Sequence, residues 1–185
     1  MNIENLKLKL RLRNFDSLKP KLAMRFLYDA DEFYRFRGAE ALGYLCRGEK
    51  ARNYILRLFW HLSDESGAYC IGAPLGIAEI GRNNPDVFEG FKNKFVSLLD
   101  DWEVERKYVA YGISRTVVKD TYPDPAEKLL EVLDELKDNP EFVAYAIIAL
   151  KKLKAEVPEE FKRDCRFVKI YDGERIKIVK ICDLL

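Results

Sequence analysis

The residues best suited to binding chemistry in this chain lie in a polar, glycine-rich stretch between two apolar segments. In order along the chain, they are Ser63-Asp64-Glu65-Ser66-Gly67, Tyr69 and Gly72-Ala73-Pro74. Asp64 and Glu65 could act as carboxylate ligands or bases, and a helix starting near Pro74 could offer backbone N–H groups to an anion. The simpler interpretation, favoured residue by residue, is that Asp64 or Ser66 caps a helix and the glycines permit a tight turn. A plain interhelical connection is shorter, so the 63–74 stretch is the best candidate binding surface.

Trp60 and His61 directly precede this stretch, and His61 is the only histidine. A lone histidine acts as a general base only where an orienting acid and a nucleophile stand nearby, and no Ser-His-Asp or Cys-His arrangement can be argued here. We therefore predict that Trp60 anchors the core and that His61 is a surface or hydrogen-bonded residue. Trp60 is kept among the candidate binding residues, and no catalytic residue is assigned.

Arginine and tyrosine recur on segments expected to line a groove, where these residue types often dominate binding. They are Arg35, Arg37, Tyr44, Arg82, Arg106, Tyr111, Arg115 and Tyr145. The alternative, which has the edge, is that these arginines pair internally with Glu40, Glu79 or Glu105. The candidate binding residues on these segments are Glu79, Arg82, Tyr111 and Arg115. Arg115 is also expected near the helix that begins at Pro74.

The four cysteines, Cys46, Cys70, Cys165 and Cys182, are scattered without a C-x-x-C pair. With one histidine in the chain, this spacing predicts neither a zinc site nor a disulfide framework. Buried thiols are the expected state, because cysteine is among the most buried residue types. No cofactor-attachment motif is present, so neither a metal nor a cofactor is assigned.

Length and charge set outer bounds on the fold and its partners. The chain has 185 residues, 48% of them apolar, which favours one domain. No window approaches the roughly 18 consecutive apolar residues of a membrane span, so a cytoplasmic location without membrane contact is expected. The net charge of +1 provides no overall field for nucleic acid or an anionic membrane. The 34% of charged residues and the absence of Gln fit a thermophile.

Both chain ends have a period of two, which is typical of strands. Leucines at positions 6, 8, 10 and 12 alternate with Lys or Arg, and the segments 167–171 and 175–179 flank Asp172-Gly173, a signal for a type I′ hairpin. A lone hairpin is marginal in water, so the first strand is expected to join it. The leucine row would then be protected by the C-terminal hairpin.

The middle of the chain has apolar residues at spacings of three and four, which predicts helices. Their expected ranges are 18–28, 33–45, 51–62, 74–82, 87–99, 104–118, 126–136 and 141–153. Short connections rich in Asp, Asn, Gly and Pro separate them, so they should pair as four antiparallel hairpins.

Two pairs of these helices look like copies of one another. Val109-Ala110-Tyr111-Gly112-Ile113 recurs 34 positions later as Val143-Ala144-Tyr145-Ala146-Ile147. Gly38-Ala39-Glu40-Ala41-Leu42-Gly43 recurs 38 positions later as Gly76-Ile77-Ala78-Glu79-Ile80-Gly81. Such periods, with small residues inside the second helix, are typical of helical solenoid repeats. The segment Phe36 to Gly43 also matches the consensus of the second HEAT helix.

The stretch from Trp60 to Gly67, followed by Gly72-Ala73-Pro74 and by Gly112-Ile113-Ser114-Arg115, resembles an uncharacterised family of short HEAT-like proteins from sulfate-reducing bacteria and archaea, sometimes labelled phycobilisome-lyase-type HEAT repeats. The similarity covers about residues 23 to 116. Ile71 and Leu75 depart from it, because the family has an aromatic residue before Gly72 and an acid after Pro74. The resemblance implies an α-helical repeat fold and transfers no catalytic residue.

These observations favour an all-α fold: a HEAT-like α-solenoid of about four helix pairs at 15–160, with a small β element formed by a strand in 1–14 and a hairpin in 161–185. The leading functional hypothesis is a non-enzymatic interaction or scaffold module that holds a protein or peptide partner in its groove and on the 63–74 loop. The alternative is a nucleic-acid binder or DNA-glycosylase-like HEAT protein, echoed by Asp101-Trp102 and Arg106 but opposed by the near-neutral charge. A lyase or chaperone for a bilin is suggested only by the family label.

Overall fold

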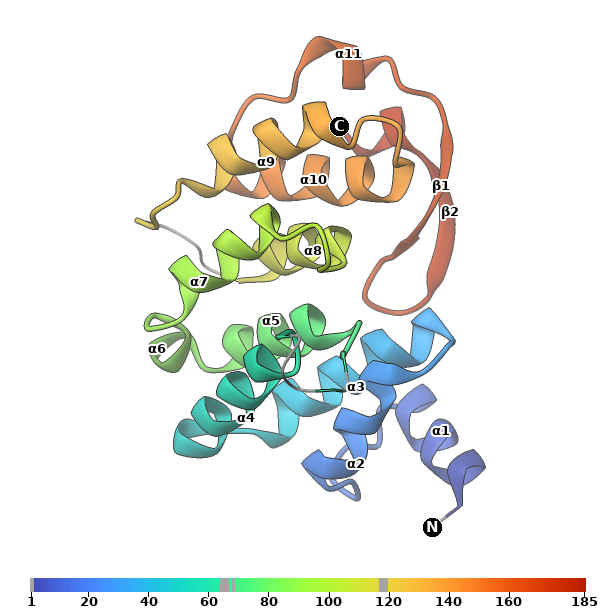
Figure 1. The fold of residues 1–185 in the computed structure, drawn as a ribbon. Coiled ribbons are helices and arrows are strands. Elements are labelled where there is room, and N and C mark those ends of the chain that lie inside the picture. The colour runs from blue at the N-terminus through green and yellow to red at the C-terminus, as the bar shows by residue number, and fades with distance from the viewer. Residues whose placement is uncertain (1, 64–66, 68, 117–119) are drawn as a thin grey trace. The chain divides into compact units, whose positions relative to one another are not determined.

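The computed structural model describes residues 2–63, 67, 69–116 and 120–185 and is mostly helical, with one small antiparallel sheet (Figure 1). The chain divides into two compact units, Met1–Phe91 and Lys92–Leu185. Each unit is described by itself below. In the described part of the chain, no helix is long and apolar enough to cross a membrane.

The first unit is built from helices that, apart from the first, lie close to the predicted positions. They are α1 (Ile3–Arg11), α2 (Pro20–Arg25) with the 3-10 turn η1 (Phe26–Tyr28), α3 (Glu32–Leu45), α4 (Gly48–Trp60), α5 (Ala73–Asn83) and the short α6 (Pro85–Phe88). Proline opens α2, α5 and α6, where its missing N–H costs nothing, and the Asp31 side chain caps α3 by accepting from the Phe33 N–H at 2.9 Å. The α2–η1 segment packs on α3, and α4 packs on α5.

The predicted N-terminal strand is wrong, because residues 3–11 form helix α1. The Asn2 side chain caps it by accepting from the Asn5 N–H at 2.9 Å. Leu6 and Leu10, one turn apart, are buried, and α1 packs on α3; Leu8 and Leu12 are exposed. In a strand all four leucines would face one side, so the helix changes which two enter the core. The predicted pairing of this segment with the C-terminal hairpin is therefore wrong as well.

Helices α3 and α5, which carry the repeated Gly-containing motif, pack directly against each other. A Cβ added at Gly43 would lie 2.8 Å from the carbonyl carbon of Glu79 and closer still to its oxygen, so no larger residue fits at this crossing. The matching Gly81 faces the ring of Phe88, 2.5 Å from where a Cβ would stand. The small residues of the motif thus allow the close approach that the sequence predicts.

The second unit repeats this arrangement with a different end. Its elements are α7 (Lys92–Ser97) with the 3-10 turn η3 (Leu98–Asp100), α8 (Arg106–Arg115), α9 (Pro125–Glu135), α10 (Pro140–Leu153), α11 (Glu159–Lys162), β1 (Phe167–Tyr171), β2 (Ile176–Lys180) and the 3-10 turn η4 (Ile181–Leu184). The α7–η3 segment packs on α8, α9 packs on α10, and α8 packs on α10. Tyr111 and Tyr145, at matching positions of the second motif, meet edge to face with ring centroids 5.7 Å apart.

Two predicted helices differ in extent from those observed. The range 87–99 is broken around Gly90, so that α6 ends at Phe88 and α7 begins at Lys92. The range 104–118 yields α8, which ends at Arg115, and residues 117–119 lie outside the described part of the chain. Each of the four predicted helix pairs is nevertheless in contact.

The C-terminal hairpin is confirmed, with Phe167 opposite Lys180 and Tyr171 opposite Ile176. Its turn is wider than the two-residue type I′ turn predicted, because residues 172–175 form a four-residue loop closed by the Asp172 side chain. That carboxylate accepts from the N–H groups of Glu174 and Arg175 at 2.9 and 3.0 Å. Strand β1 and η4 pack on α10, where the Tyr145 hydroxyl accepts from the Tyr171 N–H at 2.8 Å. The hairpin is therefore supported by helix α10 and not by a third strand from the N-terminal segment.

Candidate functional site

The first unit has a pocket of about 330 Å³ lined by three cationic side chains. Its residues, called the cationic pocket below, are Lys21, Met24, Arg25, Tyr28, Arg57 and His61. The cations are exposed, whereas Met24 and His61 are buried, so the pocket has charged walls over a partly apolar base. This is the form that ligand sites commonly take, with few polar groups placed over apolar surface.

Helices α2 and α4 position the cationic side chains. Lys21 and Arg25 lie one turn apart on α2, so they project from the same face of that helix. Arg57 lies in the last turn of α4, and its carbonyl accepts from the His61 N–H at 3.0 Å. The His61 carbonyl in turn accepts from the Cys70 N–H at 3.1 Å. The far end of the 63–74 loop is thereby fastened to the end of α4, beside the pocket.

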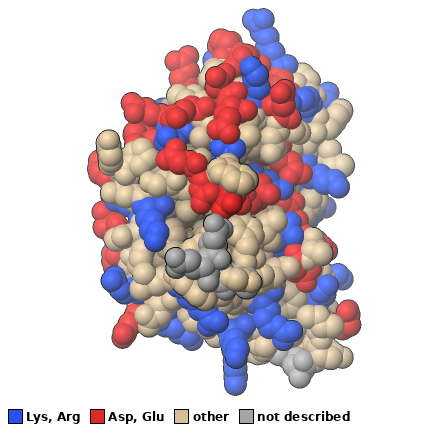
Figure 2. Space-filling model, in the orientation of Figure 1, with Lys and Arg blue, Asp and Glu red and all other residues tan. Residues whose placement is uncertain are grey.

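The positive charge of the pocket is not balanced within the described part of the chain. Across residues 2–63, 67, 69–116 and 120–185, no carboxylate forms an ion pair with Lys21, Arg25 or Arg57. Like charges spaced four residues apart on a helix destabilise it by about 0.2–0.5 kcal/mol, so Lys21 and Arg25 work against the fold. On the face drawn in Figure 2, Lys and Arg gather over part of the first unit, and Asp and Glu are frequent over the second.

The Tyr28 hydroxyl of the pocket is neutral near pH 7. Burial, together with the neighbouring Cys70, raises the pKa of Tyr28 to about 12, and burial raises the pKa of the Cys70 thiol to about 11. The Tyr28 ring meets His61 edge to face, with centroids 6.2 Å apart. Tyr28 therefore stays a hydroxyl that can donate, and it adds no negative charge to oppose an incoming anion.

Two aromatic side chains close to His61 or Cys70 in the chain are exposed. Trp60 is 52% exposed and Tyr69 is 43% exposed. The prediction that Trp60 anchors the core is therefore wrong, since Trp60 lies at the surface; His61 is buried, its backbone is hydrogen-bonded to Arg57 and Cys70, and its ring lies 5.0 Å from that of Trp60. Tyr69 directly precedes Cys70, which is bonded to His61, so both aromatics flank the loop where it meets α4. Asp64, Glu65 and Ser66 lie outside the described residues.

The structure describes Gly67 as a turn residue with φ of +64°, the left-handed region that favours glycine. A Cβ there would meet nothing within 4 Å, so its role is conformational. This agrees with the interpretation that the glycines of the 63–74 stretch permit a tight turn.

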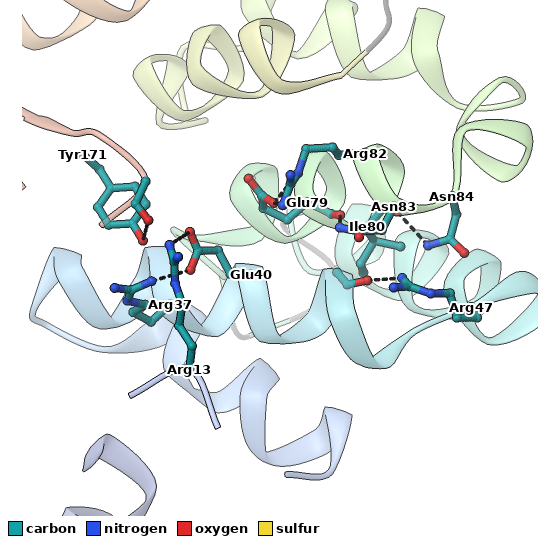
Figure 3. Close-up of polar contacts among 12 residues, drawn as sticks. Arg13, Arg37, Glu40, Arg47, Glu79, Ile80, Arg82, Asn83, Asn84 and Tyr171 are labelled. Carbon is teal, nitrogen blue, oxygen red and sulfur yellow. Dashed lines mark hydrogen bonds and ion pairs between the residues drawn. The ribbon is translucent and has the colours of Figure 1, made fainter. Parts of the chain in front are cut away.

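Glu79 and Arg82, two of the candidate binding residues, pair with each other inside the first unit (Figure 3). The Glu79 carboxylate is buried and lies 2.8 Å from the Arg82 guanidinium. Arg37 and Glu40 form a second such pair at 2.8 Å, and Arg106 pairs with Glu135, not with Glu105. Internal pairing thus accounts for these arginines, and Glu79 offers no exposed surface to a partner.

Tyr111 and Arg115 are brought together in the second unit. They line a pocket of about 280 Å³ with Ser114, Tyr145 and the hairpin residues Ile170 to Gly173. The Arg115 guanidinium lies 5.8 Å from the centroid of the Tyr111 ring, within cation–π range. The expected approach of Arg115 to the helix that begins at Pro74 would join the two units and stays a prediction.

The three cations of the first unit were not among the residues that sequence patterns singled out. Lys21 and Arg25 carry the i, i+4 spacing of one helix face, a signal available in the sequence. Arg57, 32 positions later, joins them only because α2 and α4 both flank the same α3–α5 core. Within the described residues, no group of three or more His, Cys, Asp or Glu could hold a metal ion. The pocket can bind an anion through charge and hydrogen bonds.

The structure shows a mostly helical protein with a C-terminal hairpin. Comparison with known proteins identifies its family. No family model matches the chain, and no solved structure matches it. An uncharacterised protein of the archaeon Archaeoglobus fulgidus is 61% identical over 177 residues, covering 93% of this chain and 96% of the relative. The chain belongs to the family of this archaeal protein. An uncharacterised family with archaeal members agrees with the resemblance noted from the sequence.

Proposed function

We propose that this protein is a HEAT-like helical repeat protein of the cytoplasm that acts as a non-enzymatic binding module, and that it holds an acidic peptide segment of a protein partner. The observation that carries the proposal is the convergence of Lys21, Arg25 and Arg57 on one pocket without a carboxylate partner in the described part of the chain. Repeat character is supported by the matching motifs of α3 and α5 and of α8 and α10, each pair in contact.

An acidic peptide fits the pocket better than a small inorganic anion would, because the pocket has neighbours suited to side chains. Trp60 is exposed and its ring lies 5.0 Å from that of the pocket residue His61, and Tyr69, which precedes Cys70, is exposed as well. Aromatic residues and arginine contribute most of the binding energy at many protein interfaces. A partner carboxylate could receive both the fork of Arg25 or Arg57 and the Tyr28 hydroxyl. An apolar residue of the same peptide could cover Trp60.

A nucleic acid is disfavoured as the partner. Three phosphate contacts release few counterions, and the net charge of +1 adds no long-range attraction. The residues that echoed a glycosylase also have structural roles, since the Asp101 carboxylate accepts from the Glu103 N–H at 3.0 Å and Arg106 pairs with Glu135.

The test compares binding of a fluorescent acidic peptide, built of Glu with one Phe, to the full chain and to two triple variants. Replacing Lys21, Arg25 and Arg57 by Ala should weaken binding at least tenfold. The matched control replaces Lys50, Lys137 and Lys152, which are exposed and lie outside the pocket, so it removes the same charge and should change affinity less than twofold.

Added salt should weaken the peptide complex, because salt screens the attraction between exposed charges. The screening length is about 8 Å at physiological ionic strength and shortens as salt is added. Equal loss in both triple variants would mean that net charge, and not the pocket, attracts the peptide. Tighter binding of a duplex DNA than of the peptide at physiological salt would overturn the proposal in favour of a nucleic-acid partner.

A further inference from the structure

The second unit holds two cysteines whose sulfur atoms touch. The Sγ atoms of Cys165 and Cys182 are 2.9 Å apart, about 0.9 Å more than the roughly 2.0 Å of a disulfide bond. Cys165 is exposed and Cys182 is partly exposed, whereas Cys46 and Cys70 are fully buried. The close contact and the accessibility set this pair apart from the other two thiols.

The two cysteines lie just beyond the open end of the hairpin. Phe167 and Lys180 form the last pair of the ladder; Cys165 lies two residues before β1, and Cys182 lies in η4, which follows β2 directly. Hydrogen bonds hold the backbone on either side of the pair: the Ile181 N–H donates to the Arg166 carbonyl at 3.1 Å, and the Cys182 N–H donates to the Asp164 carbonyl at 2.7 Å. The two cysteines, 17 residues apart in the chain, are thus held on neighbouring segments with their sulfur atoms in contact.

Side-chain contacts fix the same segment to the helices. Arg166 forms a forked contact with Asp164 at 3.0 and 2.6 Å and donates to the carbonyl of Lys137, just beyond α9, at 2.8 Å. Ile181, next to Cys182, is fully buried, and η4 packs on α10 and α11. Both cysteines therefore sit on backbone that is held from two sides, which favours their bonding to each other over bonding to a partner.

We infer that Cys165 and Cys182 form a reversible dithiol–disulfide site that fastens the open end of the C-terminal hairpin. The oxidant is a low-molecular-weight or protein disulfide. The Cys165 thiol loses its proton and attacks one sulfur of that disulfide, which leaves a mixed disulfide and releases one thiolate. The Cys182 thiolate then attacks the Cys165 sulfur and releases the second thiol, so two cysteines are oxidised while one disulfide is reduced to two thiols.

Closing this bond would tie the two ends of the hairpin where they rest on α10. Two strands alone are marginal in water, and this hairpin depends on its contact with α10, including the bond from the Tyr171 N–H to the Tyr145 hydroxyl. A cross-link between residues 165 and 182 closes a short loop in the unfolded chain and so favours the folded hairpin. The site would make the stability of the second unit depend on the thiol–disulfide balance around it.

The experiment uses the full chain, first reduced and then treated with glutathione disulfide while folded. Intact mass should fall by about 2 Da, the loss of two hydrogens, with peptide mapping that joins Cys165 to Cys182. The oxidised protein should melt on the order of 5 °C higher than the reduced protein. Adding dithiothreitol should reverse both changes.

Variants assign the effect to this pair. Cys182→Ser, a conservative change at a partly exposed position, should abolish the mass loss and the shift in melting temperature. Cys46→Ala removes a thiol that is buried, and its oxidised and reduced forms should still differ by the wild-type shift. A glutathione adduct that persists on Cys165, a disulfide-linked dimer, or no reaction in the folded protein would each overturn the inference.

Discussion

At the scale of single residues, the core of the first unit depends on the absence of side chains as much as on their presence. Gly43 lies where α3 crosses α5, and a Cβ there would stand 2.8 Å from the Glu79 carbonyl carbon. The obstacle is backbone, which cannot rotate away as a side-chain end could. The same helix segment carries the buried carboxylate of Glu79, so a shift of α5 would also disturb its ion pair with Arg82.

We expect Gly43→Ala to lower the free energy of unfolding by about 1–3 kcal/mol, because the overlap with Glu79 outweighs the roughly 1 kcal/mol that alanine gains in a helix. Chemical denaturation of the full chain measures the change. Gly90→Ala is the matched control, since nothing lies closer than 3.9 Å to its added Cβ, and it should be neutral or slightly stabilising. A neutral Gly43→Ala would show that α3 and α5 do not approach as closely as described.

At the scale of elements, local patterns predicted most helices because each carries its own signals. Proline and Asp or Asn caps begin α9 and α10, and apolar residues follow at helical spacing. The hairpin was also predictable, from two short β-branched runs around Asp172-Gly173. The cationic pocket was not, because it depends on how α2 and α4 are placed on a common core. Segment α1 was predicted wrongly because its alternating leucines fit the two-residue period of a strand, while Leu6 and Leu10 also fit the 3.6-residue period of a helix.

The two interpretations of α1 differ in which leucines matter. In the helix Leu10 is fully buried and Leu8 is 51% exposed, whereas in a strand they would share one face. Leu10→Ala should therefore cost about 2–5 kcal/mol of unfolding free energy, and Leu8→Ala less than about 0.5 kcal/mol. Denaturation midpoints of the two variants provide the measurement. Equal, large losses of unfolding free energy in both variants would instead support a strand at these positions.

The hairpin turn should respond to acid, because two backbone N–H groups bind the ionised Asp172. These bonds, from Arg175 and Glu174, lower the pKa of Asp172 below its usual value of 3.8. A carboxyl whose folded pKa is lowered stabilises the fold above its unfolded pKa and loses that contribution as the pH falls through the folded one. We expect the amide signals of residues 174 and 175 to shift with a midpoint below 3.8.

Asp172→Asn is the control for that titration, since it keeps an oxygen that can accept both bonds but cannot ionise. Its amide signals at the turn should stay unchanged through the same pH range. A midpoint above 3.8 in the original protein would mean that the turn does not bind the charged form.

At the scale of the whole molecule, the chain forms two units of nearly equal length, each with a pair of motif-bearing helices at its centre. The first centres on α3 and α5 and the second on α8 and α10. Their functional features also differ: the first unit has the cationic pocket, and the second has the paired cysteines and the hairpin. Because each unit is compact and has its own buried core, the two features can be studied separately.

The division predicts that residues 1–91 and 92–185, produced as separate chains, each fold. The cut leaves Phe91 with its partners, the Phe59 ring at 6.1 Å and the Arg52 guanidinium at 5.6 Å. The second fragment keeps the fully buried Tyr108 and Phe142 of its own core. Each fragment should show a helical far-UV spectrum and a cooperative melt, because each retains a hydrophobic core built from helices it contains.

A fragment of residues 1–63 serves as the control, since it loses α5 and with it the main support of α3, and should not melt cooperatively. If residues 92–185 were unfolded where the full chain is folded, the second unit would depend on the first, and the stabilising effect expected of the Cys165–Cys182 bond would have to be measured on the chain as a whole.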